Sequence, residues 1–186
     1  MPVAVAAALL ALAGPSAAAD RRPLERPNIV VMMTDDQTVA DLRAMPLTRA
    51  LLGDRGVTFS RSFSSYPLCC PARATLLTGQ YAHNHDVLGN RPPLGGYGAF
   101  RDAGNTLPVW LQRAGYRTAH VGKYLNGYGR DVAATVPPGW DEWYGSVDPT
   151  SYMMWGYTLN ENGALRTYGS FRDEDPALYQ ADVYRD

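Results

Sequence analysis

The chain has 186 residues, of which 46% are hydrophobic and 19% are charged, and its formal net charge is −1. This length allows one domain with a hydrophobic core, and the composition excludes a disordered or fibrous protein. A near-neutral chain offers a polyanion no general electrostatic attraction, so we expect no nucleic-acid partner.

The first nineteen residues have the composition of a secretory leader. Residues 3–13 are all Ala, Val or Leu, and three alanines at 17–19 suit signal peptidase. The apolar run is too short to cross a bilayer as a helix. We therefore expect a signal peptide over 1–19, a linker over 20–26, and a secreted or extracytoplasmic protein that has no membrane contact after cleavage. A buried Ala-rich helix is the alternative, and no Lys or Arg precedes the run.

Residues 28–33, which are all apolar after Asn28, predict a strand that is buried on both faces, as in a parallel sheet. Asp35 and Asp36 follow almost directly, which would place them at the carboxyl edge of the sheet, where α/β folds keep their sites. Two adjacent carboxylates suit a hard cation such as calcium or magnesium, but a turn or helix cap uses the same residues.

Helices and strands alternate along the middle of the chain. Helical spacing, with glycine after each segment, predicts helices over residues 46–54, 71–77 and 107–114. Strands are predicted over residues 57–60 and 116–121, and Lys123 follows the second of them.

The last third of the chain is rich in Gly, Pro and aromatic residues, which predicts loops and hairpins. Residues 157–159 and 165–167 are expected to pair across an Asn-Gly turn. A helix is expected to begin at Pro176 and to be still running at Asp186. The alternation of elements predicts an α/β domain with a mostly parallel sheet flanked by helices. Only about three strands are visible, so we expect the sheet to be incomplete at the C-terminus and the chain to be truncated.

The two cysteines, Cys69 and Cys70, are adjacent, and neighbours in sequence rarely form a disulfide because the ring is strained. Cys69 would lie at a helix N-terminus, where free backbone N–H groups favour a negative atom. Arg73 lies one helical turn further on and brings a fork of donors that suits oxyanions. A buried thiol pair beside a structural arginine explains the same residues equally well.

The thirteen residues 67–79 resemble the sulfatase signature, whose core is Cys-x-Pro-x-Arg followed by an apolar pair, Thr and Gly. The resemblance implies that a formylglycine-generating enzyme oxidises Cys69 to formylglycine, with Cys70 at the variable position. It implies that the hydrated aldehyde attacks the sulfur of a sulfate ester and later expels sulfate. It also implies an alkaline-phosphatase-like α/β fold for residues 27–186.

Residues 27–36 are similar to the opening strand of sulfatases. This resemblance implies that Asp35, Asp36 and the modified Cys69 bind a divalent metal, calcium or alternatively magnesium. The metal would hold a sulfate oxygen and activate the attacking group.

Residues 115–124 match the second sulfatase signature, which ends in Gly, Lys and an aromatic residue. The resemblance implies that Lys123 contacts the sulfate and the formylglycine, whereas a lysine after a strand is otherwise usually just solvated. A frequent family pattern has histidine two residues after this lysine, and Leu125 stands there instead. The acid–base assignment of arylsulfatases therefore does not carry over in detail.

Several segments resemble the N-acetylglucosamine-6-sulfatase branch, namely residues 78–85, 122–129, 138–140 and 157–160. The implied substrates are sulfated amino sugars or glycosaminoglycan fragments, so the implied partner is a sulfated carbohydrate. A phosphonate or phosphodiester hydrolase of the same superfamily is one alternative. A catalytically incomplete fragment is the other, because the family's remaining metal ligands cannot be assigned in these residues.

His83 and His85 are two residues apart, and on an extended segment both rings would face one side, as in a zinc pair. Two ligands are too few for zinc and no third candidate is near. We therefore expect both at the edge of the pocket, in contact with sulfate or sugar, with packing as the alternative. His120, inside a predicted strand, is expected to be structural.

Overall fold

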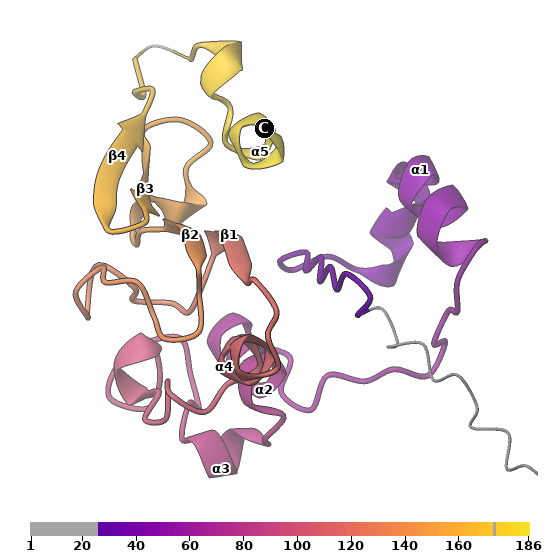
Figure 1. Ribbon diagram of the computed structural model, residues 1–186. Helices are drawn as coiled ribbons and strands as arrows, with labels where there is room; N and C mark the ends of the chain where they lie inside the picture. The colour runs from indigo at the N-terminus through magenta and orange to yellow at the C-terminus, as the bar shows by residue number, and fades with distance from the viewer. Residues whose placement is uncertain (1–25, 173) are drawn as a thin grey trace, which may run out of the picture. The chain divides into compact units, whose positions relative to one another are not determined.

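The computed structural model describes residues 26–172 and 174–186 (Figure 1). The expected leader and all of the expected linker except Arg26 lie outside the described residues. The chain divides into two units between Thr34 and Asp35, and each is described by itself. No helix in the described part of the chain is long and apolar enough to cross a membrane.

The buried strand predicted at residues 28–33 is not present. Residues 26–34 contain no helix or strand, and Val30 in the middle of the run is 78% exposed. A strand needs a neighbour for its backbone hydrogen bonds, and no described segment pairs with this one. Residues 57–60 form no strand either, for the same reason, and Val57 and Phe59 are exposed.

The helices follow the sequence pattern more closely. The predicted helix at 46–54 is found as α1, Pro46–Thr48, which continues as a π-helical turn, Arg49–Gly53. The helix predicted at 71–77 is α2, Cys69–Thr78, and it begins two residues earlier than expected. It ends at Gly79, which adopts a left-handed conformation (φ 66°) and donates its N–H to the carbonyl of Thr75.

Two short helices, α3 and α4, pack against α2 (Figure 1). The helix α4, Leu107–Arg113, confirms the prediction at 107–114, whereas α3, Ala82–His85, was not predicted. The predicted C-terminal helix is found as a 3₁₀ turn, Pro176–Leu178, followed by α5, Gln180–Arg185.

One four-stranded sheet has the order β1-β2-β3-β4. Its strands are β1 (Ala119–Lys123), β2 (Glu142–Ser146), β3 (Tyr157–Glu161) and β4 (Ala164–Tyr168). The strand predicted at 116–121 is β1, shifted towards the C-terminus. The expected hairpin is β3–β4, in which Thr158 pairs with Thr167 across the Asn-Gly turn. Both turn residues have positive φ, as a two-residue hairpin requires.

The α/β class is confirmed, but the described sheet is mixed rather than mostly parallel. Only β1 and β2 are parallel, with Gly122 opposite Gly145, and the other two pairs are antiparallel. The sequence did not predict β2, because it lies in a segment of aromatic and glycine residues that has no strand pattern. The β3–β4 hairpin pairs antiparallel with the edge of β2 that β1 leaves free, and this makes the sheet mixed. The helix α5 lies against this sheet, where the hydroxyls of Tyr184 and Ser146 are 2.5 Å apart.

The main hydrophobic cluster joins α2 to β2 and to the segment that follows β1. It contains Cys70 and Ala74 from α2, Trp143 from β2, and Tyr124 and Tyr128 from the segment after β1. The Trp143 indole donates to the hydroxyl of Tyr128 over 2.9 Å, so its polar atom is satisfied inside the core. This cluster fixes the start of α2 relative to the end of β1.

Replacing Trp143 with alanine should lower the free energy of unfolding by about 3–5 kcal/mol, because the side chain is fully buried and its loss leaves a cavity. Urea unfolding followed by circular dichroism measures the change. The matched control is Phe171→Ala, since Phe171 is exposed and should cost less than about 1 kcal/mol. Equal losses in the two variants would contradict the placement of the core.

Candidate active site

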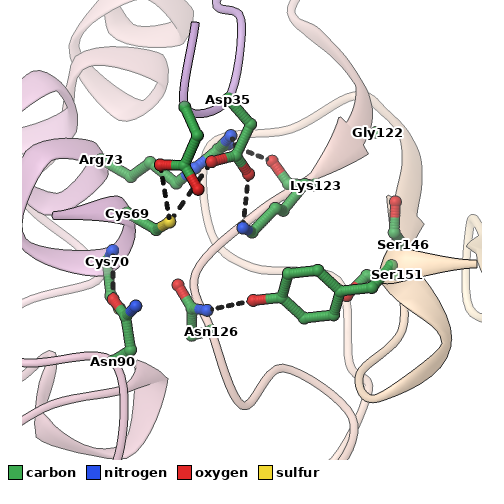
Figure 2. A network of polar contacts seen from close by, with 12 residues as sticks. Asp35, Cys69, Cys70, Arg73, Asn90, Gly122, Lys123, Asn126, Ser146 and Ser151 are labelled. Atoms are coloured by element: carbon green, nitrogen blue, oxygen red, sulfur yellow. Dashed lines mark hydrogen bonds and ion pairs between the residues drawn. The ribbon is translucent and has the colours of Figure 1, made fainter.

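Cys69 is the first residue of α2, and Leu68 before it is extended (φ −143°, ψ 141°). The chain therefore enters the helix abruptly and leaves the Cys69 side chain at the helix N-terminus. The next N–H group, that of Cys70, donates to Oδ1 of Asn90 over 2.9 Å. Figure 2 shows the Cys69 sulfur beside Asp35, whose Oδ1 is 3.2 Å away. Oδ1 of Asp36 is 3.9 Å from the same sulfur.

The two carboxylates reach the same sulfur because of the backbone at Asp36. Successive side chains on an extended segment point to opposite sides. Asp36 instead adopts a left-handed conformation (φ 52°), which aspartate tolerates better than most residues. The ligand atoms of Asp35, Asp36 and Cys69 then all lie within 4.8 Å of one another.

Two cations approach the same carboxylate from different elements (Figure 2). Lys123, the last residue of β1, donates from Nζ to Oδ2 of Asp35, and Nη2 of Arg73 on α2 lies 3.5 Å from the same oxygen. Arg73 also donates from Nη1 to the Lys123 carbonyl over 2.5 Å. Each cationic side chain is only 13% exposed, so solvent screens these contacts weakly.

The charges set the protonation of the group. Burial alone would raise the pKa of Asp35, but hydrogen bonds from Lys123 and Cys69, with the charges of Lys123 and Arg73, outweigh it and hold that pKa below its usual value. Burial would lower the pKa of Lys123, and Asp35 raises it above its usual value. Burial and the nearby Asp35 raise the pKa of the Cys69 thiol. Cys69 is therefore held as a neutral thiol, which is a weak nucleophile.

The donor set fits a hard cation in part. Asp35 and Asp36 supply the carboxylate oxygens that calcium and magnesium prefer. The third ligand atom of the group is a sulfur, which suits softer metals. An oxygen in place of the Cys69 sulfur would make the set uniform, although these three residues are fewer than a complete calcium shell requires.

His83 and His85 lie on α3 and not on an extended segment as predicted, because the chain turns into a helix after Tyr81. The Nε2 atom of His85 lies 3.1 Å from the Thr75 hydroxyl, and its Nδ1 accepts from the Val87 N–H over 3.2 Å. Both ring nitrogens of this buried residue are thus used inside the protein.

The exposed His83 ring stacks on Tyr81, with centroids 5.8 Å apart. No hydrogen bond or ring contact among the described residues joins either histidine to the Asp35–Cys69 group. Substrate contact by His83 and His85 stays a prediction, and the geometry favours packing for His85.

Two residues beside Lys123, Asn126 and Tyr152, were not predicted from the sequence as site residues. Asn126 donates from Nδ2 to the hydroxyl of Tyr152 over 2.6 Å, and Nζ of Lys123 lies 4.6 Å from the centre of the Tyr152 ring. Asn126 follows Lys123 by three residues, which was the only signal available. Tyr152 lies in a segment of loops, where nothing in the sequence connects it to Lys123.

The site residues all lie in a stretch that matches a known protein family. The family model for sulfatases matches residues 27–167 of this chain. The chain belongs to the sulfatase family. The α/β class and the alkaline-phosphatase-like fold expected from the signatures are thereby confirmed.

Three named relatives of this chain come from two animals and an alga. It is 40% identical over 155 residues to the N-acetylglucosamine-6-sulfatase of Homo sapiens, covering 77% of this chain and 27% of that protein. It is 39% identical over 152 residues to a putative extracellular sulfatase Sulf-1 homolog of Caenorhabditis elegans, covering 80% and 21%. It is 35% identical over 192 residues to an arylsulfatase of Volvox carteri, covering 98% and 28%. The chain thus spans between a fifth and three tenths of these relatives. No solved structure gives a significant match.

His120 is a packing residue, as predicted. Its ring stacks on Trp143 with centroids 4.5 Å apart, and its Nε2 lies 3.1 Å from the Gly122 carbonyl oxygen. Burial lowers the pKa of His120 to about 4.

Acid should therefore destabilise the protein through His120. The unfolded chain takes up this proton near pH 6.5 and the folded chain only near pH 4, so the stability is fully present above pH 6.5 and is lost as the pH falls towards 4. The loss should be about 3 kcal/mol. Urea unfolding between pH 7 and 4 measures it. The variant His120→Phe keeps a stacked ring that does not titrate, so between pH 7 and 4 its free energy of unfolding should fall by about 3 kcal/mol less than that of the native protein. The same pH dependence in both proteins would contradict the lowered pKa of His120.

Proposed function

We propose that this protein hydrolyses sulfate esters and that Cys69 is the precursor of a formylglycine nucleophile. One observation carries the proposal: the Cys69 thiol lies at the start of α2 between two carboxylates, with Arg73 and Lys123 beside them. Membership of the sulfatase family supports the same reading. The named sulfatases among the relatives support sulfate as the group transferred.

The unmodified thiol is an unsuitable catalyst in this position. Its raised pKa keeps it protonated, and its sulfur is the wrong donor beside two carboxylates that prefer a hard ion. Formylglycine, made by a formylglycine-generating enzyme, would supply a hydrated aldehyde. One of its hydroxyls would displace the alcohol from the ester sulfur, and loss of the proton from the other would expel sulfate and restore the aldehyde. Asp35, Asp36 and the attacking hydroxyl oxygen would hold calcium, with magnesium as the alternative, and the ion would draw charge from a sulfate oxygen.

The cationic side chains have a separate task. Arg73 is oriented by the Lys123 carbonyl and Lys123 by the Asp35 carboxylate, so neither cation has to reorganise when a sulfate ester binds. Both can donate to sulfate oxygens and stabilise the charge that grows in the transition state. The dipole of α2, whose positive end lies at Cys69, adds to the same positive potential.

Sulfated amino sugars, in glycosaminoglycan fragments, are the proposed substrate class. The relatives whose names support it are the N-acetylglucosamine-6-sulfatases of Homo sapiens and Capra hircus. A secreted or extracytoplasmic location is proposed on the name of the putative extracellular sulfatase homolog of Caenorhabditis elegans and on the apolar leader of the sequence.

Mass spectrometry of one tryptic peptide tests the modification. Cleavage after Arg61 and Arg73 releases residues 62–73, which contain both cysteines. Protein made in its own host should show a loss of about 18 mass units at Cys69. Cys70 should still react with iodoacetamide, which gives an internal control in the same peptide. Two alkylated cysteines in a host that possesses the generating enzyme would defeat the proposal.

Paired assays distinguish sulfate from phosphorus esters. The protein should hydrolyse 4-nitrophenyl sulfate faster than bis(4-nitrophenyl) phosphate. Faster turnover of the diester would favour the phosphodiesterase alternative. The other alternative, a catalytically incomplete chain, predicts no turnover of either ester and no effect of calcium on the urea midpoint.

A further inference from the structure

The ring of Tyr152 lies beside the proposed sulfate-binding lysine. Nζ of Lys123 is 4.6 Å from the ring centre, within the distance at which an ammonium is attracted to an aromatic face. Tyr152 is 57% exposed, so the hydrophobic core does not explain its position. The ammonium of Lys123 therefore has two partners, the Asp35 carboxylate and the Tyr152 ring.

Asn126 holds the other end of the same tyrosine. Its Nδ2 donates to the Tyr152 hydroxyl over 2.6 Å, while its Oδ1 is buried and has no partner among the described residues. A buried amide with an unpaired acceptor costs about 1–3 kcal/mol relative to a satisfied one. A leucine of similar size would avoid that cost but could not donate to the Tyr152 hydroxyl.

Asp148 joins the backbone segments that carry these two residues. Its Oδ2 accepts from the N–H of Gly127, next to Asn126, over 2.6 Å. Its Oδ1 accepts from the hydroxyl of Ser151, next to Tyr152. The loop after β1 and the 3₁₀ turn Thr150–Tyr152 are thus tied together one residue away from the Asn126–Tyr152 contact. A shared buried carboxylate of this kind keeps both side chains in place without a ligand.

We propose that Asn126 and Tyr152 are positioning residues that hold the ammonium of Lys123 in place for the sulfate ester. Tyr152 acts on Lys123 through its ring, and Asn126 acts on Tyr152 through its amide. The inference rests on the proposed function for its catalytic consequence, but the contact itself can be tested without activity.

Lys123 is the only lysine in the chain, so its side chain gives one signal in a protein labelled with ¹³C-lysine. In the native protein the Hε signal should lie upfield of its position in the urea-unfolded chain, because a ring current acts on protons above an aromatic face. Tyr152→Phe should keep most of the shift and Tyr152→Leu should lose it. Phe171→Leu removes another exposed ring and should leave the shift unchanged. A signal that is insensitive to Tyr152→Leu overturns the contact whether or not the protein is a sulfatase.

Kinetics with 4-nitrophenyl sulfate test the consequence for the reaction. Tyr152→Leu should lower kcat about tenfold and change KM less than about twofold, because the ring acts through a group that works in the transition state. Tyr152→Phe should lie between this variant and the native protein. Phe171→Leu should leave both constants unchanged.

Asn126→Leu separates positioning from folding. The urea midpoint should stay the same or rise, because a buried unpaired acceptor is removed, while kcat should fall about threefold. A lower midpoint with unchanged kcat would show that Asn126 is structural and would overturn the proposal. Equal kcat in all variants, with the Hε shift lost in Tyr152→Leu, would overturn the positioning role and leave the proposed function intact. A native protein without turnover would instead sink the proposed function.

Discussion

Cys69→Ala is expected to lower kcat/KM for 4-nitrophenyl sulfate by about a million-fold, to the level of the reaction without a nucleophile. The reason is that alanine cannot be converted to formylglycine and that no neighbouring side chain can replace it. Cys70, the only other thiol, is fully buried, and burial raises its pKa to about 11. The measurement is the rate for protein produced in a host with the generating enzyme.

Cys70→Ala is the matched control for this variant. Its side chain packs in the core and has no contact with Asp35, Asp36 or Lys123, so the activity should stay within about threefold of the native value. The variant should lose about 1 kcal/mol of stability, because a small buried group is removed. Activity in Cys69→Ala above that of a blank, or complete loss in Cys70→Ala, would contradict the assignment of the two cysteines.

Asp35→Asn is expected to weaken calcium binding at least about a hundredfold and to lower kcat/KM at least about a thousandfold. The amide keeps the size of the side chain but removes the charge that Lys123 and Arg73 share. Two cations would then lie together without a carboxylate between them, and the metal would lose one of its charged ligands. Isothermal titration with calcium and the sulfate-ester assay measure the two effects.

Asp102→Asn provides the comparison, because Asp102 is exposed and is not one of the three residues of the candidate metal group. It should change neither calcium affinity nor turnover by more than about twofold. Unchanged calcium affinity in Asp35→Asn would exclude Asp35 as a ligand. A loss in turnover without a loss in calcium affinity would assign Asp35 to the orientation of Lys123 alone.

The site could be predicted further than the fold. The sequence signatures identified Cys69, Arg73 and Lys123 as site residues. The structure brings them together with Asp35 and Asp36, although these residues come from separate segments. These residues were recognisable because their chemistry depends on a fixed local order in the sequence. Asn126 and Tyr152 could not be linked in this way, since their contact joins positions 26 residues apart.

The helices were predicted from short-range patterns, and α2 and α4 lie where glycine and apolar spacing placed them. Strands depend on a partner that local pattern does not reveal. The apolar run at residues 28–33 has the composition of a buried strand but no partner in the described part of the chain, and β2 has a partner but no such composition. The parallel or antiparallel direction of each strand pair, which makes the sheet mixed, could not be predicted either, because it also depends on the partner strand.

Lys123 also governs how the protein can be handled. Because every other basic side chain of these 186 residues outside the three histidines is an arginine, Lys123 is the one side chain among them that reagents for primary amines acylate. Coupling these residues to a resin, a dye or a sensor chip through a side-chain amine should therefore modify the proposed site. The site amine is 13% exposed and bonded to Asp35, so it should react slowly in the folded chain. The acylation rate of Lys123 in the folded chain therefore measures how often its ammonium leaves Asp35 and becomes exposed to solvent.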